Sequence, residues 1–168
     1  FSGDSILPIV NFNRTSNVLI LRSLSKTAGL AGLRIGFAIG NHMVIERINR
    51  VTGPYDINSF AVTAAFAALK DQAYIDAYVS EVLNAKDWIQ NELQASGKRY
   101  HIGGGNYFLL WPKRNPKEIE ACLKDEGILV RSMENKPFLE GSLRISIGTP
   151  KQMEKFWRTF CKYDELIH

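Results

Sequence analysis

A polar loop between two short apolar runs is the feature that most constrains this sequence. The apolar runs cover residues 18–21 and 35–39. Both are short, rich in branched side chains and bounded by polar residues or glycine, a pattern that predicts two buried strands. The polar residues between them that matter most are Ser23, Ser25, Lys26 and Arg34. The sequence therefore predicts a strand–loop–strand unit that presents an amine, hydroxyl groups and a guanidinium from one segment.

Each of these groups has a chemical role toward a ligand that carries both a carbonyl and a phosphate. The amine of Lys26 can form a Schiff base with an aldehyde. Serine hydroxyls and loop N–H groups can donate to phosphate oxygens, and Arg34 can meet a phosphate with two parallel donors. Pyridoxal 5′-phosphate carries that aldehyde and that phosphate, so the loop chemistry favours this cofactor.

The spacing of the loop residues adds a family resemblance. Residues 23–36 read Ser-Leu-Ser-Lys-Thr-Ala-Gly-Leu-Ala-Gly-Leu-Arg-Ile-Gly. This segment resembles the cofactor-lysine signature of fold-type I pyridoxal-phosphate enzymes, and most closely that of class I and II aminotransferases of the histidinol-phosphate type. The resemblance implies that Lys26 is catalytic and carries the cofactor, while Ser23 and Arg34 hold the cofactor phosphate. A nucleotide P-loop is excluded because Ser25 stands where that motif requires glycine.

A second arginine fits the same family. Residues 141–150 read Gly-Ser-Leu-Arg-Ile-Ser-Ile-Gly-Thr-Pro. The alternation predicts a half-buried strand over 142–147, with Arg144 on its polar face. The segment resembles the one whose arginine binds the acidic end of the aminotransferase substrate, an α-carboxylate in most members and a phosphate in histidinol-phosphate aminotransferases. We therefore expect Arg144 to bind substrate.

The predicted fold class is α/β, with the end of a large cofactor-binding domain followed by a small C-terminal α/β domain. Helical spacing predicts helices that start at Asn41, at Asn58 or Ser59, and at Gln72. In the small domain, strands are predicted over 106–111, 128–130 and 142–147, and helices after Asn115 and Thr149. With the resemblance, the predicted division is 1–70 for the large domain, 71–96 for an interdomain helix and 97–168 for the small domain.

Composition excludes several classes of function. The formal net charge is +4, and no basic block with interleaved aromatics occurs, so no nucleic-acid partner is expected. No apolar run is long enough to span a bilayer, so no membrane partner is expected either. Cys122 and Cys161 match no metal or redox spacing and are predicted to be free, buried thiols in a reducing compartment, the cytoplasm. The three histidines do not cluster with other ligand types, so no metal is expected.

The resemblance implies pyridoxal-phosphate-dependent transamination by the full-length parent, with histidinol phosphate as the favoured amino donor and 2-oxoglutarate as the favoured 2-oxo acid. It also implies that the full-length parent is a homodimer. A threonine-phosphate decarboxylase or an aromatic amino-acid aminotransferase carries nearly the same motifs. A non-catalytic interaction module is an alternative of another class, although such a module has no use for the lysine. The chain opens on Phe1 and is expected to be the C-terminal part of a longer enzyme. Because the family's other cofactor-binding groups precede this point, we expect the 168 residues alone to bind the cofactor weakly and not to turn over.

Overall fold

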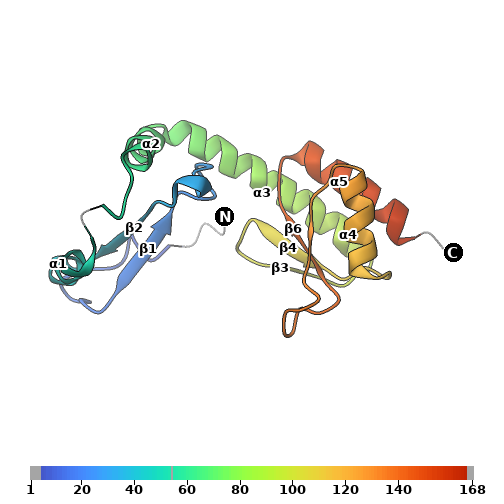
Figure 1. Ribbon diagram of the computed structural model, residues 1–168, viewed down its shortest axis with the longest axis horizontal. Coiled ribbons are helices and arrows are strands. Elements are labelled where there is room, and N and C mark those ends of the chain that lie inside the picture. Colours follow the sequence, from blue (N-terminus) through green and yellow to red (C-terminus); the bar gives the residue numbers. More distant parts are fainter. Residues whose placement is uncertain (1–4, 54, 166–168) are drawn as a thin grey trace. The chain divides into compact units, whose positions relative to one another are not determined.

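The computed structural model describes residues 5–53 and 55–165, which form a mixed α/β fold (Figure 1). The described residues divide into two compact units, one ending at Tyr78 and the other beginning at Val79. This division falls inside the longest helix, α3 (Gln72–Ala95). The assignment of residues 1–70 to a cofactor-binding domain stays a prediction. Within the described ranges, every helix is too short or too polar to cross a bilayer.

The first unit is built on a two-stranded antiparallel sheet. Its elements in chain order are β1 (Leu19–Ser23), the 3₁₀ helix η1 (Ala31–Leu33), β2 (Gly36–Gly40), α1 (His42–Val51) and α2 (Ser59–Lys70). The register of β1 and β2 runs from Leu19 opposite Gly40 to Ser23 opposite Gly36. The predicted strand–loop–strand unit is therefore an antiparallel ribbon, and the polar loop connects its two strands.

Asparagine caps begin both helices of this unit, at the predicted Asn41 and at Asn58, one of the two predicted starts of the second helix. The side chain of Asn41 accepts a hydrogen bond from the Met43 N–H, and that of Asn58 accepts one from the Ala61 N–H. Each cap satisfies an N–H that the first turn of a helix leaves without a backbone partner. The small side chains of α2 let the helix approach its neighbours closely. The core of the unit consists of Leu24, Ile35, Ala61 and Ala65.

The two strands of this unit are not buried, which corrects the prediction. Leu19 is 40% exposed and Leu21 is 72% exposed. An apolar run identifies a strand that can be buried, but burial requires a layer that covers it. In the described residues, the covering contacts reach Leu24 and Ile35 at the ends of the loop rather than the middle of β1.

The second unit contains a four-stranded antiparallel sheet in the order β3-β4-β6-β5. Its strands are β3 (Tyr100–Ile102), β4 (Tyr107–Leu110), β5 (Arg131–Ser132) and β6 (Leu143–Ser146), and its further helices are α4 (Pro116–Asp125) and α5 (Pro150–Asp164). One face of β6 is buried through the predicted alternation of Leu143, Ile145 and Ile147. The ring of Phe156 on α5 packs edge-on against Phe108 on β4, with the ring centroids 6.0 Å apart.

Local signals placed the helices of this unit correctly, but they placed one strand wrongly and missed another. A capping box begins the helix predicted after Thr149, because the side chains of Thr149 and Gln152 each accept a hydrogen bond from the other's backbone N–H. The predicted strand over 128–130 is wrong, since ladder pairing starts only at Arg131. The sequence analysis also missed β3, which pairs with β4. A strand exists only where a partner supplies hydrogen bonds, and no local pattern reports the partner. Cys122 and Cys161 are free but only half-buried, which corrects the prediction of buried thiols.

A buried ion pair joins the last helix of the second unit to the segment before β3. The Lys98 Nζ lies 2.6 Å from Asp164 Oδ2, and the two side chains are 5% and 0% exposed. The other oxygen of Asp164 accepts hydrogen bonds from the backbone N–H groups of Lys113, at 2.7 Å, and Arg114, at 3.3 Å. The carboxylate therefore ties the end of α5 to the segment before β3 and to the segment after β4.

Removing the charge of Asp164 tests this junction. We expect Asp164→Asn to lower the free energy of unfolding by about 3 kcal/mol, because it leaves the Lys98 ammonium buried without its counter-charge. Denaturant unfolding of the purified chain measures the change. Glu165→Gln is the matched control, since that carboxylate lies 3.9 Å from the same Nζ and is 62% exposed; we expect it to change stability by less than about 0.5 kcal/mol. Equal losses in the two variants would contradict this account.

Gly36 is fixed by the close approach of the two strands in the first unit. A Cβ at this position would lie 2.6 Å from the backbone oxygen of Arg22. We expect Gly36→Ala to destabilise the ribbon by about 1–3 kcal/mol, because a backbone atom cannot move away cheaply. Gly32→Ala is the control, since its Cβ would meet no atom within 4 Å. Hydrogen exchange of the β1–β2 amides measures the stability of the ribbon in both variants. Equal protection in the two would show that the close approach of the strands does not require glycine at position 36.

Candidate functional site

The loop between β1 and β2 folds back on Leu24. The Leu24 carbonyl accepts hydrogen bonds from the N–H groups of Ala28, at 3.3 Å, and Leu30, at 3.2 Å. Gly29 adopts a left-handed backbone with φ +68°, which glycine tolerates at little cost. The buried side chains of Leu24 and Ile35 anchor the loop at both ends. The loop is thus a compact element held by its own backbone and by two core residues.

The ladder brings two of the predicted cofactor residues to the same end of the ribbon. Ser23 is the last residue of β1 and lies opposite Gly36, two residues after Arg34. Arg34 has a left-handed backbone with φ 54°, an uncommon conformation for a residue with a side chain. Backbone strain of this kind is often kept at binding sites. The loop end therefore places a hydroxyl and a guanidinium near the ends of one pair of strands.

The side chains of this end are open to a ligand. Lys26 is exposed and makes no hydrogen bond or ion pair within the described part of the chain. Arg34 is exposed as well, and its Nη1 donates a 3.4 Å hydrogen bond to the Ala31 carbonyl, which leaves most of its five N–H donors open. The Ser23 Oγ accepts a hydrogen bond from the Ser25 N–H at 3.1 Å. This donor set fits a ligand with a carbonyl for the amine and a phosphate for the guanidinium and the hydroxyl.

A second group of basic residues lies on the outer face of the four-stranded sheet. In register across the sheet, His101 is opposite Leu109, Leu109 is opposite Arg144, and Arg144 is opposite Arg131. Residues directly opposite one another in an antiparallel sheet share a face. Arg144 is half-buried and Arg131 is exposed. We name the two residues the arginine pair.

Aromatic stacking fixes Arg144 within this face. Its Cζ lies over the ring of Tyr107, 4.4 Å from the centroid. Like charges placed directly opposite each other on a sheet repel, so the arginine pair costs stability unless an anion lies between the two groups. A doubly charged phosphate suits such a pair better than a single carboxylate does. The pair is therefore a candidate site for a phosphorylated ligand.

The structure places the sequence-predicted residues in both units. Ser23, Lys26 and Arg34 belong to one loop of the first unit, and Arg144 belongs to β6 of the second. Sequence reasoning missed Arg131, because the preceding apolar run was interpreted as a strand that ends before it. The signal that finds Arg131 is the β5–β6 register. In the described ranges, no three His, Cys, Asp or Glu side chains are grouped so as to hold a metal ion.

Comparison with curated proteins finds relatives over nearly the whole chain. A histidinol-phosphate aminotransferase of Syntrophotalea carbinolica is 37% identical over 156 residues, covering 92% of this chain and 44% of that protein. One from Geotalea uraniireducens is 38% identical over 158 residues, with the same two coverages, 92% and 44%. The chain thus spans less than half the length of these relatives.

Solved structures show the same likeness. The histidinol-phosphate aminotransferase of Clostridium acetobutylicum superposes with a TM-score of 0.79 at 26% identity, over 98% of this chain and 51% of that one. The L-threonine-O-3-phosphate decarboxylase of Porphyromonas gingivalis superposes with a TM-score of 0.71 at 25% identity, over 90% of this chain and 48% of that one. The Sinorhizobium meliloti histidinol-phosphate aminotransferase, solved with pyridoxal-5′-phosphate, superposes with a TM-score of 0.72 at 24% identity, over 89% of this chain and 41% of that one. The matches cover the C-terminal portion of the proteins compared.

The family model that describes class I and II aminotransferases matches residues 1–160, which include the lysine loop and the arginine pair. This match covers far more than half of the chain and agrees with the mixed α/β fold. The chain therefore belongs to the class I and II aminotransferase family.

Proposed function

We propose that this chain is the C-terminal part of a pyridoxal-phosphate-dependent aminotransferase that acts on histidinol phosphate and 2-oxoglutarate. The observation that carries the proposal is the lysine loop. In this loop Lys26 is exposed, has no hydrogen bond or ion pair within the described residues, and lies between Ser23 and Arg34 in a chain of this family. The loop's donor set fits the aldehyde and the phosphate of the cofactor. When bound, pyridoxal phosphate supplies a carbonyl for imine formation and a ring that accepts electrons.

Each residue of the loop has a distinct part in this proposal. Lys26 would hold the cofactor through its Nζ, and the same nitrogen would carry a proton to and from the substrate α-carbon. Arg34 and the Ser23 hydroxyl bind the cofactor phosphate through charge-assisted hydrogen bonds. The ladder between β1 and β2 holds these groups at one end of the ribbon, so that little ordering remains to be done on binding.

The arginine pair supports a phosphorylated amino donor. In the proposal, Arg144 and Arg131 bind the phosphate of histidinol phosphate, and the stacking of Arg144 on Tyr107 orients its guanidinium. The phosphate then removes the repulsion between the two guanidinium groups. The curated relatives with the same substrate in their names support this choice.

A threonine-phosphate decarboxylase is the second candidate. The likeness to the Porphyromonas gingivalis decarboxylase supports it, and its substrate also carries a phosphate for the arginine pair. The two reactions differ in their products. Transamination requires a 2-oxo acid as acceptor and releases no gas, whereas decarboxylation releases carbon dioxide with no acceptor present.

The proposal extends to assembly and location. We propose that the full-length protein is a cytoplasmic homodimer and that the 168 residues alone bind the cofactor weakly without turnover. The exposed apolar side chains of β1 support the last point, because Leu19 and Leu21 have no covering layer in the described residues.

Replacing the lysine tests the reaction. In the full-length protein, we expect Lys26→Ala to abolish transamination and the visible absorbance that the cofactor gains when it binds covalently, because no other described group of the loop carries an amine. Assays with histidinol phosphate and 2-oxoglutarate, together with absorbance spectra, measure both. Lys70→Ala is the control, since this lysine lies exposed at the end of α2. A Lys26 variant that keeps both properties would exclude the assignment.

Replacing the arginine pair tests the substrate. We expect Arg131→Gln or Arg144→Gln to raise the KM for histidinol phosphate about 10- to 100-fold, since a hydrogen bond to a charged group contributes about 1.5–3 kcal/mol. The exposed Arg158 on α5 provides the control variant Arg158→Gln. Steady-state kinetics of the full-length protein measures the change. An unchanged KM with histidinol phosphate, or carbon dioxide released from threonine phosphate, would favour another member of the family.

A further inference from the structure

One glycine of the turn between β3 and β4 has no room for a side chain. A Cβ at Gly105 would lie 3.1 Å from Cε1 and 3.2 Å from Cδ1 of the Tyr107 ring. Carbon atoms pack best about 3.5–4.0 Å apart, so a methyl group at this position would press on the ring. Gly103, in the same turn, is less restricted, because its Cβ would lie at an ordinary contact distance of 3.8 Å from His101 Nε2.

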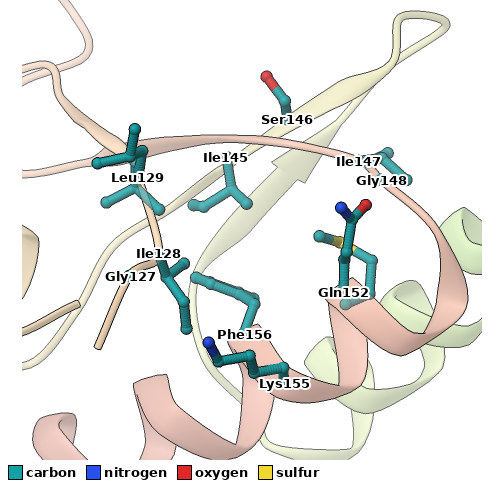
Figure 2. A pocket seen from close by; sticks show the side chains of 12 residues that line it. Gly127, Ile128, Leu129, Ile145, Ser146, Ile147, Gly148, Gln152, Lys155 and Phe156 are labelled. Atoms are coloured by element: carbon teal, nitrogen blue, oxygen red, sulfur yellow. The ribbon is translucent and has the colours of Figure 1, made fainter. Parts of the chain in front are cut away.

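The tyrosine ring beside this glycine lies on the same face of the sheet as the arginine pair. The inner face of β6 lines an apolar hollow of about 410 Å³, where Ile145 points toward Phe156 (Figure 2). Ser146 points to the other side of the strand in the same view. Tyr107 is directly opposite Ser146 in the β4–β6 register, and residues directly opposite one another share a face. Tyr107 is therefore on the outer face.

The tyrosine ring in this position supports one member of the arginine pair. The Arg144 Cζ lies over the ring of Tyr107, 4.4 Å from its centroid. A guanidinium over an aromatic face is attracted to it and keeps its planar donors directed outward. The missing Cβ at Gly105 thus leaves room for the ring position on which Arg144 lies.

The backbone around this glycine is held, so the ring is the part that a methyl group would displace. The Ile147 N–H donates a 2.8 Å hydrogen bond to the Asn106 carbonyl, which extends the β4–β6 ladder to the end of the turn. The Lys86 Nζ on α3 donates a 2.6 Å hydrogen bond to the Gly103 carbonyl. The tyrosine side chain, in contrast, is 39% exposed and can rotate to another rotamer.

We propose that Gly105 is a positioning residue for substrate binding, because the space it leaves for the Tyr107 ring sets the orientation of Arg144 and so the affinity of the arginine pair for a phosphate dianion. The inference rests on the proposed function, which assigns the phosphate of the amino donor to this pair. A guanidinium already oriented by a ring loses less freedom when the phosphate binds. Without the ring, repulsion from Arg131 turns Arg144 away from the pair.

NMR of the arginine side chains tests the geometry without cofactor or substrate. Protons above an aromatic ring resonate upfield, so in the 168-residue chain we expect the side-chain protons of Arg144 to lie upfield of those of the exposed Arg158. Gly105→Ala and Tyr107→Leu should abolish this shift, whereas Tyr107→Phe and the control Gly103→Ala should keep it. An Arg144 shift that survives Gly105→Ala would overturn the proposal.

Steady-state kinetics of the full-length protein tests the effect on binding. We expect Gly105→Ala and Tyr107→Leu to raise the KM for histidinol phosphate about 3- to 10-fold and to change kcat less than about twofold, because the loss acts on binding and not on the reacting atoms. Tyr107→Phe keeps the ring and Gly103→Ala keeps its position, so both should leave the KM within about twofold. An unchanged KM in Gly105→Ala would contradict the proposal.

Further outcomes separate this inference from damage to the fold and from failure of the proposed function. If Gly105→Ala does not fold, the comparison of Tyr107→Leu with Tyr107→Phe decides, and equal KM values for these two would overturn the inference. A full-length protein that does not use histidinol phosphate would overturn the inference together with the proposed substrate. A lost NMR shift with an unchanged KM would overturn the inference alone and leave the reaction standing.

Discussion

The antiparallel pairing of β1 with β2 is the constraint on which the candidate cofactor site depends. Pairing Ser23 with Gly36 brings together the two ends of a loop that would otherwise be free to open. The loop then closes on the Leu24 carbonyl, and Leu24 and Ile35 anchor it in a small core with the alanines of α2. Without this ladder, the segments that carry the hydroxyl, the amine and the guanidinium would be free to separate.

In the second unit, antiparallel pairing positions the arginine pair. Register across four strands places Arg144 opposite Arg131 and next to Tyr107. The other face of the sheet is closed by apolar side chains and by the aromatic contacts of α5. A stable hydrophobic face thus supports an outer face that concentrates positive charge. The apolar packing on one face of the sheet therefore offsets the repulsion between the two arginines on the other face.

Both units keep apolar surface that the described residues do not cover. In the first unit this surface includes Leu21 on β1, and in the second it includes Leu129 beside the apolar hollow. A contiguous exposed apolar patch can mark a surface that contacts another part of a protein. The relatives, which are more than twice as long as the matched region, have the length to supply such contacts.

The sequence by itself determined the family motif, the helix caps and the periodicity of the helices and of β6, because these depend on residues close together in the chain. Asn41, Asn58, Asn115 and Thr149 all cap helices where the sequence indicates a start. The roles of Ser23, Lys26, Arg34 and Arg144 stay predictions that the fold accommodates. Only the tertiary structure decided which strands have partners. It shows that β1 is exposed, that residues 128–130 are unpaired and that Arg131 lies opposite Arg144. Strand pairing joins residues far apart in the sequence, and neither local preference nor local pattern carries that information.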